Sequence, residues 1–127
     1  MELINNYISI RQPFAEAIVR GLKIIENRSW STSFRGRLFV HASKSTESLE
    51  DGLEFIREIT GKPFKHKLTF GAIIGSVEIT DCVISHPSPW FVGRFGFVLA
   101  QPRRVSPIYF SANTGIRPLP QNLLRQP

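Results

Sequence analysis

Apolar and polar positions in the first part of the chain predict a strand, a short helix and a second strand. Residues 6–10 alternate weakly between apolar and polar side chains, which indicates a short strand. From Phe14 to Leu22 the apolar residues recur at helical spacing. Pro13 suits the first turn of this helix and Gly21 suits its end. We therefore expect a helix of about eight residues here.

The stretch after this helix predicts a strand from Lys23 to Trp30, a polar turn over 31–36 and a buried strand over 38–42. Side chains alternate between the two faces of a regular strand, so Lys23 and Glu26 would point to opposite faces. A bend or bulge would instead bring both side chains into one cleft. The alternation alone leaves both arrangements open.

A second helix is predicted from about residue 47 to Gly61. Its apolar residues form a single stripe, and acidic residues crowd its first turn, which suits a helix N-terminus. Polar residues over 43–46 offer helix caps, and Pro63 follows the end of the helix.

The remaining pattern is mostly that of strands. We expect strands over 70–84, 95–100 and 105–110, with Pro102 closing the middle one. From about residue 111 the chain shows little pattern and several prolines, which predicts an irregular C-terminal tail.

Length and element pattern together predict one domain of the α+β class. The 127 residues fit a single domain over 1–127, and 42% apolar content is enough for a core. Several short strands and two helices predict a small, mostly β barrel with two or more helices packed outside it.

The charge of the chain favours an anionic partner. The formal net charge is +6 and the isoelectric point is about 10.1, which points first to nucleic acid or a nucleotide. A basic surface that serves only solubility is the alternative.

The sequence gives no support for a disulfide, a signal peptide, a membrane helix, a metal site or a cofactor site. The lone Cys82 allows no internal disulfide, and residues 1–10 do not resemble a signal peptide. No apolar run approaches the ~20 residues of a membrane helix, so we expect no membrane partner and a cytoplasmic protein, or a nuclear one if the source is eukaryotic. The three histidines are scattered, and phosphate-loop and dinucleotide motifs are absent, so no metal or cofactor is expected. Nothing indicates an oligomeric state.

Polar and charged residues gather between positions 9 and 30 in a way that predicts the wall of a binding cleft. They are Ser9, Arg11, Gln12, Lys23, Glu26, Arg28 and Trp30. Arg35 and Arg37 flank a glycine and either contact phosphate or belong to an exposed turn. Lys23, Glu26 and Arg28 form either a structural ion pair at a sheet edge or a candidate catalytic cleft. In that cleft Glu26 holds a cation in place and Lys23 meets an anion or a carbonyl. A desolvated lysine beside other cations loses proton affinity, which is how lysines become bases or nucleophiles.

The stretch from residue 9 to 30 resembles the opening signature of the ASCH domain, the activating-signal-cointegrator homology family. The hallmark G-x-K-x-x-E-x-R is matched at Gly21, Lys23, Glu26 and Arg28. The resemblance continues, up to about residue 108, through 34–38, 41–43, 70–75 and 95–99.

The resemblance implies a stand-alone ASCH domain with a β-barrel of the PUA-like type. It also implies a cleft beside the first helix that takes RNA, single-stranded nucleic acid or a modified nucleotide. In that cleft Arg11, Lys23, Arg28 and also Arg35 and Arg37 would meet phosphates or base edges. Trp30 would stack on a base, a contact worth roughly 1–3 kcal/mol.

The resemblance does not decide whether the protein is an enzyme or only binds its ligand. Some small bacterial members resemble amidohydrolases that remove the acetyl group of N4-acetylcytidine, with a catalytic lysine that matches Lys23. Those members have threonine where this chain has Glu26, and their second acidic residue has no match here. The runner-up to binding is an enzyme that uses the same cleft, either such an amidohydrolase or a ribonuclease, and a protein-interaction role in transcription or translation is the third alternative.

Overall fold

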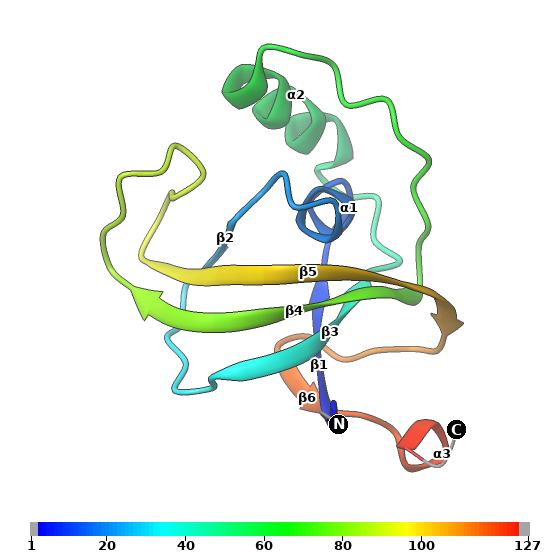
Figure 1. Ribbon diagram of the computed structural model, residues 1–127. Helices are drawn as coiled ribbons and strands as arrows, with labels where there is room; N and C mark the ends of the chain where they lie inside the picture. The colour runs from blue at the N-terminus through cyan, green and yellow to red at the C-terminus, as the bar shows by residue number, and fades with distance from the viewer. Residues whose placement is uncertain (1–2, 125–127) are drawn as a thin grey trace.

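The computed structural model describes residues 3–124 as one six-stranded sheet with three helices (Figure 1). The elements in chain order are β1 (Asn6–Ile10), α1 (Phe14–Val19), β2 (Ile25–Arg28), β3 (Gly36–Ala42), α2 (Leu49–Thr60), β4 (Ala72–Val83), β5 (Phe95–Tyr109), β6 (Ile116–Pro118) and α3 (Gln121–Leu124). The order of strands across the sheet is β2-β5-β4-β3-β1-β6. The predicted α+β class is confirmed.

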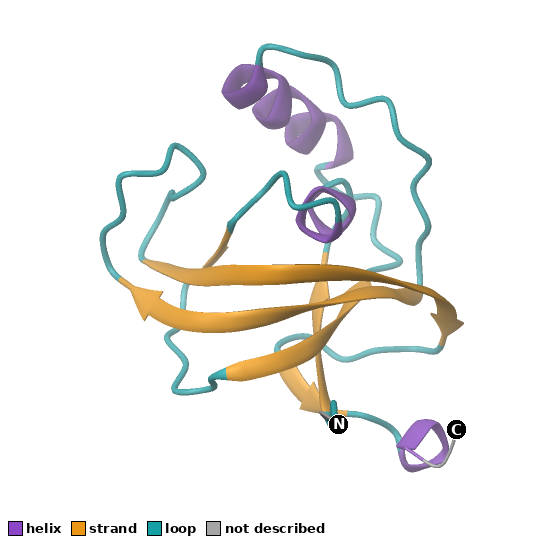
Figure 2. Ribbon diagram, in the orientation of Figure 1, coloured by secondary structure: helices purple, strands orange, loops and turns teal. Residues whose placement is uncertain are grey.

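The sheet curls into a half-barrel, with α1 against its face and α2 beyond α1 (Figure 2). Neighbouring strands run antiparallel except β1 and β3, which are parallel. Because β1 lies between β3 and β6, the two ends of the described chain meet at one side of the sheet. This arrangement brings the first strand next to residues that follow β5.

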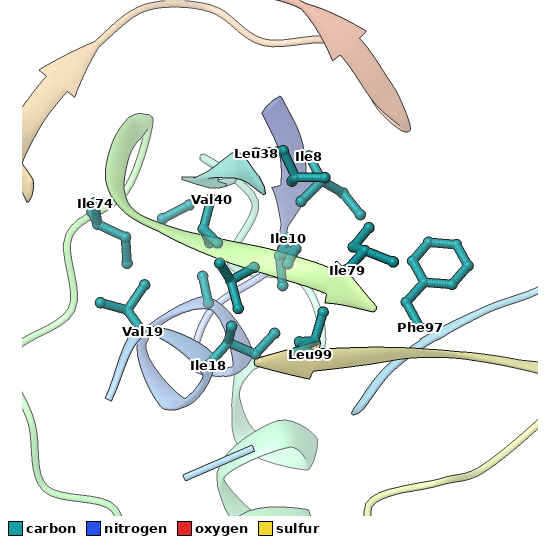
Figure 3. Packing of buried hydrophobic residues seen from close by; sticks show 13 residues of the cluster. Ile8, Ile10, Ile18, Val19, Leu38, Val40, Ile74, Ile79, Phe97 and Leu99 are labelled. Atoms are coloured by element: carbon teal, nitrogen blue, oxygen red, sulfur yellow. The ribbon is translucent and has the colours of Figure 1, made fainter. Parts of the chain in front are cut away.

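The main core lies between α1 and the sheet. Figure 3 shows its side chains converging from α1, β1, β3, β4 and β5. Those labelled are Ile8, Ile10, Ile18, Val19, Leu38, Val40, Ile74, Ile79, Phe97 and Leu99. Gly75 of β4 allows the close approach of α1, because a Cβ there would lie 2.7 Å from a methyl of Val19. Burial of these apolar side chains fixes α1, and with it the residues that flank α1, against the sheet.

A second apolar cluster joins α2 to the region of α1 and β2. Ile56 of α2 packs with Ala17, Ile25 and Trp90, all of them buried. Close contact is possible because α2 carries Gly52, where a Cβ would lie 2.7 Å from the ring of Pro13. The second helix therefore covers the outer side of α1 and not the sheet.

Two expectations from the sequence are wrong. Pro102 does not end a strand, because β5 runs on to Tyr109. β2 pairs with β5 only as far as Val98, so Pro102 stands where β5 has a free edge, and there the missing N–H of proline costs no sheet hydrogen bond. The tail is not wholly irregular either, since β6 pairs with β1 and Leu119 is buried.

Candidate functional site

A cleft of about 310 Å³ opens beside the start of α1, between the end of β1, β2 and the loop before β6. Its lining residues are Ser9, Ile10, Arg11, Phe14, Glu26, Asn27, Arg28, Ser43 and Thr114. Four stretches that are separate in the sequence, around 9–14, 26–28, 43 and 114, therefore contribute to one concave surface.

The end of α1 brings Lys23 to this region. Gly21 has φ +77°, and the N–H groups of Gly21 and Leu22 donate to the carbonyls of Ile18 and Ala17. This hydrogen-bond pattern is a Schellman motif, which ends the helix and reverses the chain. Lys23 thus lies before β2 begins.

Lys23 and Glu26 share one site. Lys23 Nζ donates to the carbonyl of Ile25 and lies 3.5 Å from Glu26 Oε1. Strand alternation would have separated the two side chains, but it does not apply because β2 begins only at Ile25. The arrangement that needs a bend is therefore the observed one.

Glu26 lies between two cations, and we call Lys23, Glu26 and Arg28 the Glu26 cluster. Arg28 Nε donates to Glu26 Oε2 at 2.8 Å, and another guanidinium N–H donates to the carbonyl of Ser9 at 2.6 Å. The side chains of Lys23, Glu26 and Arg28 are only 2%, 9% and 18% exposed. Arg28 therefore ties β2 to β1 across the cleft, and the cluster carries one excess positive charge in a largely dry setting.

Burial lowers the pKa of Lys23 from its ordinary value. The positive charge of Arg28 lowers it further, whereas the charge and the hydrogen bond of Glu26 act in the opposite direction. From the sequence alone we expect the charge of Glu26 to keep Lys23 protonated. Burial is the larger cause, so the net shift is downward.

A second cavity of about 250 Å³ adjoins the cleft on the side of Lys23. The two share Phe14, Glu26 and Asn27, and the second cavity adds Lys23, Phe55 and Val92. Asn27 fixes one wall, because its amide donates to the carbonyl of Trp90 and accepts from the N–H of Val92, each at 2.9 Å.

A third cavity of about 340 Å³ continues the cleft in the other direction. It shares Arg28 and Thr114 with the cleft and adds Trp30 and Arg117. Trp30 is half-buried, edge-on to Phe97 at 5.2 Å, and its ring lies 5.7 Å from the guanidinium of Arg28. The three cavities follow one another along β2, and Arg28 lies where the cleft meets the third cavity.

The structure places six of the nine predicted binding residues along these adjoining cavities. They are Ser9, Arg11, Lys23, Glu26, Arg28 and Trp30. Arg11 is exposed and forms a 3.6 Å ion pair with Glu47, which is also exposed.

Gln12, Arg35 and Arg37, which the sequence places among the candidate binding residues, do not line these cavities. Gln12 turns inward, where it accepts from the N–H of Glu16 and donates to the carbonyl of Thr69. Arg37 is buried on β3 and donates to Ser76 Oγ at 3.0 Å. Arg35 lies in an exposed turn, 3.6 Å from Asp81.

Thr114 is the lining residue that sequence reasoning missed most clearly. It lies in the tail expected to be irregular, and it reaches the cleft only because β6 pairs with β1. The sequence places Asn27 in the strand after the first helix without a role, and it gives Ser43 only as part of a motif and as a possible helix cap. No local pattern identifies these residues as cleft walls.

Residues 3–124 meet the requirements of neither a metal cluster nor a membrane-spanning helix. In this part of the chain no group of three His, Cys, Asp or Glu side chains is arranged to hold a metal ion. Over the same residues no helix combines the length and the apolar content needed to cross a bilayer.

Comparison with known sequences identifies relatives for most of this region. A family model for the ASCH domain matches residues 8–92. Activating signal cointegrator 1 of Homo sapiens is 36% identical over 81 residues, which are 60% of this chain and 14% of that protein. The Mus musculus protein of the same name gives the same identity and coverage. The chain thus spans only a small part of the length of these relatives.

Comparison with solved structures identifies the fold. The crystal structure of ASCH from Zymomonas mobilis matches with a TM-score of 0.55 and 16% identity, covering 92% of this chain and 88% of that one. A mutant of the Zymomonas mobilis protein matches with a TM-score of 0.56 and 15% identity, covering 91% and 90%. The curled sheet with its helices is therefore the PUA-like fold of ASCH structures, as predicted.

Proposed function

This chain belongs to the ASCH domain family, and on that premise we propose that its cleft binds single-stranded nucleic acid or a nucleotide. The observation that carries the proposal is that three cations, Arg11, Lys23 and Arg28, line the cleft and the cavity next to it, where Glu26 is the one carboxylate among the lining residues. Both oxygens of Glu26 already accept from Lys23 and Arg28, so Glu26 adds little repulsion toward an anion. The cleft is therefore suited to a negatively charged ligand.

The shape of the cleft supports a nucleotide over a compact anion. Its volume of about 310 Å³ lies at the lower end of the ~300–1,000 Å³ common for small-molecule sites. Phe14 and Ile10 supply apolar surface for a ring, and Ser9, Ser43 and Thr114 carry hydroxyl groups that donate and accept hydrogen bonds. The neighbouring cavities at Lys23 and Trp30 extend the binding surface on both sides, as a strand of several nucleotides requires.

Binding of a short single-stranded RNA as a function of salt concentration tests this proposal. The logarithm of the association constant should fall with the logarithm of salt with a slope of about −0.7 for each neutralised phosphate. Arg11→Ala should reduce the slope, because Arg11 is an exposed cation on the cleft wall. An affinity that does not change with salt, or no binding to RNA, DNA or nucleotides, would contradict the proposal and favour a protein partner.

A second candidate function is hydrolysis in the same cleft, and one observation favours it. Lys23 is a buried lysine with a lowered pKa, and it faces a cavity of about 250 Å³ that adjoins the cleft. Perturbed lysines of this kind are typical of general bases. Glu26 opposes this role because its carboxylate stabilises the ammonium form of Lys23.

The release of cytidine from N4-acetylcytidine tests this second function. We expect slow or no turnover by the wild type, and faster turnover by Glu26→Thr, because loss of the carboxylate lowers the pKa of Lys23 further. Fast wild-type turnover that disappears in Lys23→Ala would make hydrolysis the principal function.

A further inference from the structure

A small cavity of about 180 Å³ lies beside the cleft and is separate from the three cavities described above. Its lining residues are Ser9, His41, Ser43, Lys44, Ser111 and Ala112. Ser9 and Ser43 also line the cleft, so the two cavities adjoin. Among these lining residues none is a carboxylate, and Lys44 is the strongly basic one.

The backbone of Gly71 holds Lys44 in place. A Cβ at Gly71 would lie 3.0 Å from Cγ and 3.1 Å from Cε of Lys44, so the lysine stem lies directly over the glycine. The ammonium group lies 3.4 Å from Ser111 Oγ. Across residues 3–124 Lys44 forms no ion pair, and an ammonium group has three donors, so it retains the capacity to bind an anion.

The serine hydroxyls of this cavity are arranged as donors. Ser43 Oγ accepts from the N–H of Ser45 at 3.1 Å, and Ser111 Oγ accepts from Lys44. A hydroxyl that already accepts can still donate its own proton, so both hydroxyls are able to donate to a ligand. Ser9 adds a third hydroxyl at the border with the cleft.

His41 fixes the segment that carries Ser111. Its Nε2 lies 3.0 Å from the carbonyl of Phe110, and because a carbonyl only accepts, Nε2 carries the proton. The rings of His41 and Phe110 are also in edge-to-face contact at 4.8 Å. The cavity therefore has a fixed wall, with Ser111 directly after the anchored residue.

We propose that this cavity binds a phosphate group of the nucleotide or nucleic acid whose nucleoside part occupies the cleft. One ammonium group and three hydroxyls around a cavity without carboxylates suit a phosphate. The volume is below the ~300 Å³ common for a whole small molecule, so it fits a group of a few atoms and not a nucleoside. This inference rests on the proposed function. The phosphate is either a terminal monophosphate or an internal phosphodiester.

Calorimetric titration with three sets of ligands tests the inference. The ligands are the four ribonucleosides, their 3′- and 5′-monophosphates, and dinucleoside monophosphates, whose only phosphate is internal. The variants are Lys44→Ala and Ser111→Ala, with Lys62→Ala as the matched control because it removes the same charge from an exposed residue that lines none of these cavities. Both test residues are exposed, so the fold should survive their replacement.

We expect the phosphate to increase wild-type affinity about tenfold over the nucleoside, as a charge-assisted contact does. Lys44→Ala should abolish that gain and Ser111→Ala should reduce it, while Lys62→Ala should leave it unchanged. A gain with the monophosphates identifies a terminal phosphate, and a gain with the dinucleoside monophosphates alone identifies a phosphodiester.

Two results would overturn the inference alone. The first is a wild-type affinity that the phosphate does not change, and the second is a gain in affinity from the phosphate that survives in Lys44→Ala. Either result overturns the inference alone if nucleosides or RNA still bind and this binding depends on Arg28. An equal loss in Lys44→Ala and Lys62→Ala would show an effect of net charge only, and it would also overturn the phosphate site. If no nucleoside, nucleotide or RNA binds at all, the proposed function fails together with the inference.

Discussion

Two buried carboxylates in this chain, Glu16 and Glu26, each lie between two cations but in different surroundings. Glu16 on α1 pairs with Arg20 at 2.6 Å and with Arg104 of β5, whose other guanidinium N–H donates at 3.1 Å. The side chains of Arg20 and Arg104 are 43% and 50% exposed. In the Glu26 cluster both cations are largely buried, and three adjoining cavities meet there.

The difference in exposure indicates that a contribution to folding stability is enough to account for the charges around Glu16 but not for those of the Glu26 cluster. The arginines around Glu16 stay partly in water while they join α1 to β5, so these two cations lose little hydration in the contact. Burial of Lys23 costs desolvation, and apolar residues in place of a buried ion pair are often as stable or more so. The charges of the Glu26 cluster therefore need a reason beyond folding, and the adjoining cleft supplies one.

The largest difference between the two groups is expected when each carboxylate is removed and the loss of folding stability is compared. Glu26→Gln leaves Lys23 buried beside a neutral amide and should destabilise the fold by about 3–5 kcal/mol. Glu16→Gln should cost only about 1 kcal/mol, because both arginines remain hydrated. Urea unfolding measures both free energies. If Glu16→Gln lost more stability than Glu26→Gln, exposure of the paired cations would not determine how much stability is lost.

Replacement of one arginine from each group should separate binding from folding. Arg28→Ala should weaken binding of a short single-stranded RNA about tenfold, because it removes a charge-assisted contact at the centre of the cleft. Arg104→Ala removes the same charge away from the cleft and should leave affinity unchanged.

Circular dichroism of both arginine variants supplies the control. We expect both to remain folded. If Arg28→Ala unfolds while Arg104→Ala does not, Arg28 serves mainly to hold Ser9 and Glu26 together, and its role is structural.

The pH dependence of stability should give the smallest effect. The pKa of Lys23 in the folded chain lies below its ordinary value of 10.5, so between the two values the unfolded chain binds more protons and stability rises with pH. The destabilisation by charged Lys23 is complete below the folded pKa and disappears as pH rises to 10.5. Wild type should therefore gain stability relative to Lys23→Met across this window. Urea midpoints of the two proteins at several pH values measure it, with Lys62→Met as the exposed control, and a constant difference would contradict it.

Local patterns predicted the parts of the fold that depend on neighbours in the sequence. The first helix, its end at Gly21 and the strand that follows were predicted because apolar spacing and glycine chemistry act within a few residues. The resemblance to the ASCH domain predicted the fold and the position of the cleft. The contact between Lys23 and Glu26 could not be predicted, because it depends on whether the strand begins before or after Lys23.

Long-range pairing explains the remaining failures. Thr114 lines the cleft because β6 pairs with β1, and no pattern within the tail shows that partner. Arg28 and Arg37 look alike in the sequence, but one lines the cleft and the other is buried against Ser76. Whether each arginine lines the cleft or is buried depends on the strand beside it in the sheet, and that strand is distant in the sequence.

The pairing of β1 with β6 also has a consequence for how the molecule matures during synthesis. Synthesis releases β1 well before β6, and domains form as the chain emerges. While β6 is still inside the ribosome, the edge of β1 remains unpaired and the wall at Thr114 is missing. The nascent chain would thus form most of its sheet before the cleft is complete, because the wall at Thr114 is added only when β6 pairs with β1.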